Sequence, residues 1–273
     1  MSELHKACER GDLKQVNSLL SSNNINTQNI YGETPLYVVS KYAHLDIVEV
    51  LVRRKECDLN IPNEQGNTPL YIACMHGHNS TVQLLVADQR SQLNLKNRKG
   101  ETPLHIACED GHLDDVKILV SRKDCDLNIP DERGNTPLHK ACQHGHHSTV
   151  EFLVNNQRCN PNITNTSKFT PIHIASEHGH MNVVKVLVRR KDCYLNIPDE
   201  RGNTPLHTAC KHGHHSIVEF LVADQRCQLN TQNGEMNTPL HIACYTKALR
   251  IIRLLLDRKC STNIPNKKGE TAR

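Results

Sequence analysis

The chain has 273 residues and a formal net charge of only +4, from 33 Lys and Arg residues against 29 Asp and Glu residues. A balance this even argues against nucleic acid as the partner. No apolar run approaches the length that crosses a bilayer, so we expect no membrane association.

A tripeptide recurs at a fixed spacing along the chain. Thr-Pro-Leu, with Ile in place of Leu once, begins every 34 residues, at Thr34, Thr68, Thr102, Thr136, Thr170, Thr204 and Thr238. A fixed period of this size predicts an array in which each repeat packs on its neighbours. We predict a single array over residues 1–273, with repeats at 1–31, 32–65, 66–99, 100–133, 134–167, 168–201, 202–235 and 236–268 and a partial repeat at 269–273.

Residues 66–99 show what one repeat contains. Thr68 can cap a helix with its hydroxyl, and Pro69 suits the first helical position, where no N–H is needed. Gly77 ends this helix, because a left-handed backbone is least costly for Gly, and apolar residues at three- and four-residue spacing indicate a second helix. The turn that ends at Gly100 predicts a β-hairpin-like finger. Neither helix is long enough to be stable alone, so stability has to come from stacking.

These residues carry a family resemblance. The pattern Thr-Pro-Leu-His-x-Ala, followed by Gly-His, stands at residues 102–112, 136–146 and 204–214 and resembles the ankyrin repeat. A 34-residue period also suits tetratricopeptide repeats, but their Trp/Leu-Gly/Tyr pattern is absent and the chain has no Trp. The resemblance implies an all-α solenoid of stacked helix-turn-helix units with hairpin-like fingers. It also implies a non-enzymatic module that binds a protein through the concave face made by the finger tips and the ends of the first helices.

Some repeats depart from this pattern. Ala43 and Lys247 replace the Gly that precedes the second helix, and Lys168 and Met236 replace the Gly of the finger. Because Gly is the residue that these turns favour, we expect the fingers at Lys168 and Met236 to be less regular.

A second, slower period is also present. Residues 128–139 and 196–207 are identical and lie 68 residues apart. Alternate repeats therefore resemble each other more than neighbouring repeats do, which is consistent with duplication of pairs.

The cysteines follow the repeat. Five share one repeat position and six share another: Cys74, Cys108, Cys142, Cys210 and Cys244, then Cys57, Cys125, Cys159, Cys193, Cys227 and Cys260. Stacked helices lie about 8–10 Å apart, whereas a disulfide needs Cα atoms within about 7 Å. We expect no disulfide between neighbours within a series and buried thiols in the first series. Since the first repeat begins at once without a secretory signal, we also expect a cytoplasmic location.

Two clusters rich in Cys and His, at residues 142–147 and 210–215, suggest a metal site. We predict no metal, because the cysteines are expected to face inward and no closed set of four ligands is visible. The motif histidines, such as His105 and His207, recur at equivalent positions, so bonding to backbone fits them better than acid–base catalysis. No Cys is distinguished as a nucleophile and no phosphate-binding loop is present, so we predict no catalytic residue and no cofactor.

The candidate partner-binding residues occupy finger tips and the exposed ends of the first helices. They are Tyr42, Met75, His76, Arg98, Lys99, Arg133, His144, Lys168, Phe169, His178, Arg201, His212 and Tyr245. The middle finger tips are often basic, which favours a partner with an acidic segment, and the aromatic residues and Met75 are the expected hot spots. Phe169 stands where other repeats have Asn or Glu.

We therefore expect a monomeric adaptor or scaffold without chemistry of its own. The alternative is the recognition arm of a larger enzyme, such as a kinase or a ubiquitin ligase, whose catalytic domain is absent from this chain.

Overall fold

The computed structural model describes residues 2–20 and 24–272; Met1, residues 21–23 and Arg273, which the predicted array includes, lie outside the described residues. The chain divides into an N-terminal half, Met1–Glu132, and a C-terminal half, Arg133–Arg273. The N-terminal half contains α1 (Glu3–Arg10), α2 (Leu13–Leu20), α3 (Pro35–Tyr42), α4 (Leu45–Val52), α5 (Pro69–Met75), α6 (Asn79–Ala87), α7 (Pro103–Glu109) and α8 (Leu113–Ser121). The C-terminal half contains α9 (Pro137–His144), α10 (His147–Val154), α11 (Pro171–His178), α12 (Met181–Arg189), α13 (Pro205–Lys211), α14 (His215–Ala223), α15 (Pro239–Tyr245) and α16 (Leu249–Asp257). That the halves act as one array stays a prediction.

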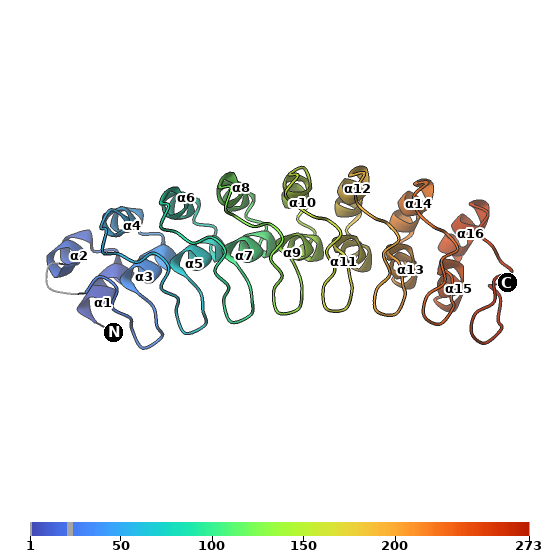
Figure 1. Ribbon diagram of the computed structural model, residues 1–273, viewed down its shortest axis with the longest axis horizontal. Coiled ribbons are helices and arrows are strands. Elements are labelled where there is room, and N and C mark those ends of the chain that lie inside the picture. Colours follow the sequence, from blue (N-terminus) through green and yellow to red (C-terminus); the bar gives the residue numbers. More distant parts are fainter. Residues whose placement is uncertain (1, 21–23, 273) are drawn as a thin grey trace. The chain divides into compact units, whose positions relative to one another are not determined.

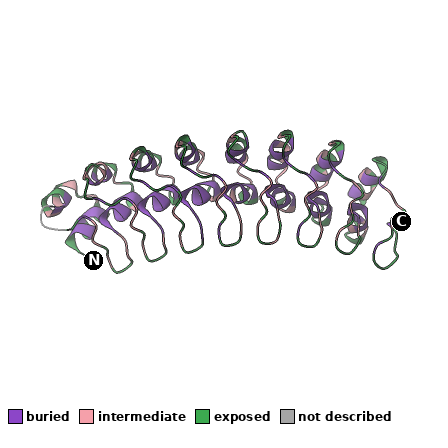
Figure 2. Ribbon diagram, viewed as in Figure 1, coloured by how far each residue is buried: buried purple, intermediate pink, exposed green. Residues whose placement is uncertain are grey.

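Within each half the helices form two rows. The odd-numbered helices pack against one another, as do the even-numbered helices, and the loops between helix pairs form fingers beside the odd-numbered row (Figure 1). The faces that meet are buried and the outer faces are exposed (Figure 2). This is the all-α solenoid of stacked helix pairs that the repeat pattern predicts. None of the described helices has both the length and the apolar character to cross a membrane.

The recurring Thr-Pro begins every odd-numbered helix after α1. In α13, Thr204 is the N-cap, Pro205 follows it, and the Nδ1 atom of His207 accepts a hydrogen bond from the Thr204 N–H at 3.1 Å. The Nε2 atom of His207 lies 3.0 Å from the carbonyl oxygen of Asn237 in the next finger. Because burial lowers the pKa of His207 to about 4, the ring is neutral near pH 7 and donates from Nε2. The motif histidine thus joins a helix start to the next repeat, which confirms its structural interpretation.

Every odd-numbered helix is followed within two residues by a left-handed residue. At Gly179 the reason is space, because a Cβ there would lie 2.6 Å from the ring of His214. That ring is held by its Nε2 atom, 2.9 Å from the carbonyl oxygen of Glu177. Ala43 and Lys247 adopt the same conformation, with φ of 60° and 54°, so the chain path is kept without Gly.

The finger turn is also kept where Gly is missing. Lys168 and Met236 are left-handed, with φ of 59° and 58°, and each N–H donates to the carbonyl oxygen three residues earlier at 2.8 Å, as Gly100 does at 2.9 Å. The prediction that these two fingers are less regular is therefore wrong for the turn itself. A small difference lies in the contact with the next finger instead. The hydrogen bond to the next finger is 3.2 Å long after both, against 2.7–3.0 Å after the Gly fingers.

The two cysteine series line the core. Every cysteine is buried except Cys244, which is half-buried, and burial raises the pKa of Cys159, Cys193 and Cys227 to about 12. No disulfide joins any of the twelve cysteines, all of which lie among the described residues.

Arginine side chains in the loops that follow the even-numbered helices join consecutive repeats. Arg226 donates to four backbone carbonyl oxygens of the preceding repeat, at residues 188, 190, 191 and 193, and its Nε donates to Asp224 at 3.0 Å. Arg190 bonds the carbonyl oxygens of residues 154 and 156 in the same way, but its partner Asp192 follows it in sequence. Asp-x-Arg at residues 88–90 and 224–226 and Asn-x-Arg at 156–158 alternate with Arg-x-Asp at 122–124 and 190–192, which gives the 68-residue period a structural counterpart.

Candidate protein-binding site

The predicted binding residues lie at the finger tips and at the C-terminal ends of the odd-numbered helices. In each half we call this surface, made by the finger tips together with those helix ends, the groove face of that half. Its finger-tip residues are 31, 64–65, 98–99 and 132 in the N-terminal half and 133, 166–169, 200–201, 234–235 and 267–268 in the C-terminal half. Phe169 is half-buried, and the other twelve predicted residues are exposed: Tyr42, Met75, His76, Arg98, Lys99, Arg133, His144, Lys168, His178, Arg201, His212 and Tyr245. The first five of these belong to the N-terminal half and the others to the C-terminal half.

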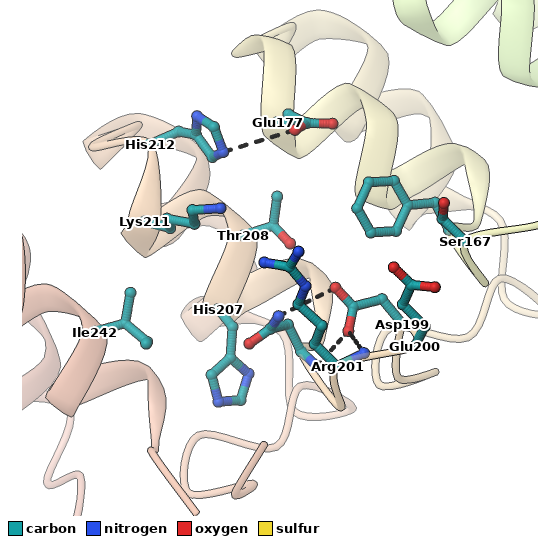
Figure 3. Close-up of a pocket in the computed structure, with 12 residues that line it drawn as sticks. Ser167, Glu177, Asp199, Glu200, Arg201, His207, Thr208, Lys211, His212 and Ile242 are labelled. Atoms are coloured by element: carbon teal, nitrogen blue, oxygen red, sulfur yellow. Dashed lines mark hydrogen bonds and ion pairs between the residues drawn. The ribbon is translucent and has the colours of Figure 1, made fainter. Parts of the chain in front are cut away.

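A hollow of about 220 Å³ opens on the groove face of the C-terminal half. Two fingers and the helices α11, α13 and α15 contribute its lining: Ser167, Phe169, Glu177, Asp199, Glu200, Arg201, Asn203, His207, Thr208, Lys211, His212 and Ile242. Figure 3 shows the side chains of Arg201, Lys211 and Glu177 reaching toward this space from different segments. The structure therefore brings together three of the predicted residues, Phe169, Arg201 and His212.

Two substitutions in the repeat pattern produce this hollow. Thr208 stands at the position that Ile174 and Ile242 occupy in the repeats on either side, and its shorter side chain leaves the floor lower. Phe169 forms a wall in place of Asn or Glu. Its ring stacks on the ring of His173, with centroids 5.5 Å apart and planes 8° apart, so the stacked face of Phe169 is occupied and its position is set.

The charged side chains that line the hollow differ in whether they already have hydrogen-bond or ion-pair partners. The carboxylate of Asp199 is buried and accepts from the backbone N–H of Arg201 at 2.8 Å, from the backbone N–H of Asn203 at 2.7 Å and from the Asn203 side-chain amide at 3.1 Å. In contrast, Arg201 and Lys211 have no side-chain partner among the described residues. Two cations are thus available at the hollow, while its most buried carboxylate is satisfied.

Exposed histidines of the C-terminal half are held by stacking. His144, His178 and His212 each stack on the histidine two residues later, with centroids 6.0–6.2 Å apart and planes 10–11° apart. The Nε2 atom of His212 lies 3.8 Å from a carboxylate oxygen of Glu177. Burial lowers the pKa of His212, and the Glu177 charge opposes this, so the ring is neutral near pH 7.

Sequence reasoning missed three residues of the lining that matter. Thr208 was not selected, although it is the one Thr at a position otherwise held by Val, Ile or Lys. Glu177 and Lys211 share a repeat position with Met75 and Tyr245, which were selected. If the residue at this position had been considered in every repeat, Glu177 and Lys211 would have been found.

The described residues contain no group of three or more His, Cys, Asp or Glu side chains that could hold a metal ion. The Cys and His clusters around residues 142–147 and 210–215 instead split between the core and the groove face. Cys142 and Cys210 are fully buried, whereas His144 and His212 point to the surface side of α9 and α13 as exposed rings.

Comparisons with known proteins agree with this architecture. A family model described as ankyrin repeats in three copies matches residues 4–97, 79–165 and 149–233, and one described as ankyrin repeats in many copies matches residues 223–273. A search of curated proteins found no matching sequence. Ankyrin repeats are in general non-catalytic modules that bind other proteins. Because the matches span nearly the whole chain, this protein belongs to the ankyrin-repeat family and is a protein–protein interaction module.

Proposed function

We propose that the chain is a monomeric cytoplasmic adaptor or scaffold that holds a protein partner on the groove face, with the hollow of the C-terminal half as the main contact. The observation that carries the proposal is the pair Arg201 and Lys211, two cations without a side-chain partner beside the half-buried ring of Phe169. The motif histidines, by comparison, are used to join repeats. A reducing compartment fits the twelve cysteines, none of which forms a disulfide.

The charge of the finger tips favours a partner with an acidic segment. In the C-terminal half the finger tips carry five basic residues, Arg133, Lys168, Arg201, Lys267 and Lys268, and two acidic residues, Glu200 and Glu235. In the N-terminal half they carry two of each sign: Arg98 and Lys99, Glu64 and Glu132. Exposed charges act over about 8–10 Å at physiological salt, so an acidic segment is attracted to the C-terminal half in particular.

Aromatic rings at helix ends supply the apolar part of the contact. Tyr42 and Tyr245 are 45% and 53% exposed, and their hydroxyls donate to Glu9 and Glu270. These hydrogen bonds fix the rings while leaving much of their surface open, and such rigid, amphipathic anchors are typical of binding hot spots.

Affinity capture from lysate with three baits tests the proposal. The first bait is the unaltered chain, and the second carries Arg133→Glu, Lys168→Glu and Arg201→Glu on the groove face. The third is a matched control with Arg189→Glu, Lys191→Glu and Arg253→Glu, three exposed basic residues outside that face. Circular dichroism checks that all three remain folded.

We expect the first and third baits to retain the same protein and the second to lose it. Retention by all three baits would contradict binding through the groove face. Equal loss from the second and third would mean that only overall charge matters, and would also contradict the proposal.

A further inference from the structure

We propose that the hollow beside Phe169 is an anchor site for one carboxylate side chain of the partner's acidic segment, set next to an apolar side chain, and that a second carboxylate inside the hollow is opposed. This inference rests on the proposed function, because it names the chemistry of the segment that the groove face holds. It follows from the donors, the acceptors and the apolar surface that line the hollow.

The donors favour a carboxylate. Arg201 extends from a finger and Lys211 from the end of α13, and both line the same hollow (Figure 3). A guanidinium presents its N–H groups in a fixed fork that fits a carboxylate, and an ammonium adds a point charge with rotatable donors. Since neither side chain has a partner to give up among the described residues, no existing ion pair has to be broken when a carboxylate binds.

The acceptors restrict this preference to one carboxylate. Glu177 lies at one rim, 3.8 Å from the neutral ring of His212, and Glu200 is exposed in the same finger as Arg201. Like charges across an interface oppose binding. Asp199 is only 6% exposed and already accepts three hydrogen bonds, so its carboxylate does not compete with the partner for Arg201 or Lys211. A second carboxylate inside the hollow would thus face Glu177 or Glu200.

The remaining lining suits an apolar neighbour. Phe169 forms one wall, Ile242 contributes to the lining from the next repeat, and Thr208 lowers the floor between them. The volume of about 220 Å³ is smaller than the roughly 300–1,000 Å³ typical of small-molecule pockets. A pocket of this size is suited to side chains of a protein segment that continues along the groove face.

Site-specific photo-crosslinking identifies the segment that occupies the hollow. We would place the aromatic crosslinker p-benzoylphenylalanine at Phe169, where it keeps an aromatic wall, and in separate proteins at Met75 and at Tyr194. Met75 samples the groove face of the N-terminal half, and Tyr194, which is 62% exposed in the loop after α12, samples the surface outside the groove face. Captured peptides are sequenced by mass spectrometry.

We expect the probe at Phe169 to capture a segment with one Asp or Glu within two or three residues of an apolar residue. Capture there of a segment without a carboxylate overturns the inference but leaves the proposed function standing. Capture at Met75 and not at Phe169 also overturns the inference, and it contradicts the hollow as the main contact while leaving binding on the groove face standing. Capture at Tyr194 alone overturns both.

Affinities of the captured segment, made as a synthetic peptide, complete the test. The double variant Arg201→Gln and Lys211→Gln should weaken binding by at least about tenfold, whereas the control Arg189→Gln and Arg253→Gln should change it less than about twofold. Removing an opposing charge with Glu200→Gln should tighten binding by about two- to fivefold. A peptide whose neighbouring residues are changed to Glu should bind more weakly than the original. Tighter binding of that acidic peptide, or no effect of the double variant, overturns the inference.

Discussion

Asp115 in α8 is the most unusual buried residue of the N-terminal half. Its side chain is fully buried, and its two carboxylate oxygens have no hydrogen-bond partner among the described residues. The equivalent positions in the two preceding repeats hold Ile47 and Thr81, which are also buried. Burial, with a smaller effect of the Asp114 charge, raises the pKa of Asp115 from 3.8 to about 7. Replacing Asp115 with Thr should therefore stabilise the protein, and by more at high pH.

The effect of Asp115 on the free energy of unfolding follows from the linkage between proton binding and folding. Below about pH 4 the carboxyl is protonated in both the folded and the unfolded state, so its pKa shift has no effect on stability. Between about pH 4 and 7 the unfolded chain has lost the proton and the folded protein keeps it, so the free energy of unfolding falls as the pH rises. A difference of about three pH units between the two pKa values corresponds to about 4 kcal/mol above pH 7, at about 1.36 kcal/mol per unit.

Urea unfolding followed by circular dichroism at pH 5, 6, 7 and 8 measures this effect. All other titrating groups are shared by the two proteins, so the difference between the Asp115→Thr variant and the unaltered protein isolates Asp115. We expect the stability advantage of the variant to grow by about 2–3 kcal/mol from pH 5 to pH 8. Glu219→Gln, at an exposed position in α14, serves as the control and should give a change below about 0.5 kcal/mol.

An advantage that stays constant from pH 5 to pH 8 would refute the reasoning. It would mean that Asp115 is already ionised in the folded protein and solvated or paired there. A loss of stability in the Asp115→Thr variant at pH 8 would refute it as well, because the carboxylate would then be contributing to the fold.

Three further predictions concern the contacts that join repeats. Arg226→Ala removes four contacts to backbone carbonyl oxygens and should lower the free energy of unfolding, measured in urea, by about 1–3 kcal/mol. The control Arg253→Ala, at an exposed position, should lower it by less than about 0.5 kcal/mol. Equal losses in the two variants would contradict the role of Arg226 in joining repeats. Burial lowers the pKa of His207 to about 4. Its contribution to the free energy of unfolding should therefore be present above about pH 6.5 and be lost as the pH falls toward 4. A His207→Gln variant whose free energy of unfolding depends less on pH over that range would confirm it. Lys168→Gly relieves a left-handed backbone and should raise the thermal midpoint, by an amount equivalent to about 0.5–1 kcal/mol. A lower midpoint would show that the Lys side chain stabilises the finger.

Most of the fold could be predicted because its signals are local and are repeated in every unit. Thr204, Pro205 and His207 lie within four residues of one another, and their capping hydrogen bonds depend little on distant parts of the chain. The period of 34 residues then places the same local unit again and again, so stacking could be inferred without knowing a single contact. The same logic identified the first cysteine series as core residues and the motif histidines as structural.

The candidate site could be predicted only in part, because it is assembled from residues of different repeats. Phe169, Arg201 and His212 were recognised as unusual residues at surface positions, but their convergence on one hollow depends on Thr208 in the floor of the next repeat. Whether Glu177 and Asp199 remain available to a partner also depends on tertiary hydrogen bonds and distances.

The sequence by itself determined the repeat, its helix pairs, its core positions and the face on which exposed residues differ. Only the tertiary structure decided that Lys168 and Met236 keep the left-handed turn, that Asp115 is buried without a partner, and which charges of the hollow are engaged. The physical reason is that helix capping and turns act between residues close in sequence, whereas strain, burial and ion pairing depend on the neighbouring repeat, 30 or more residues away along the chain.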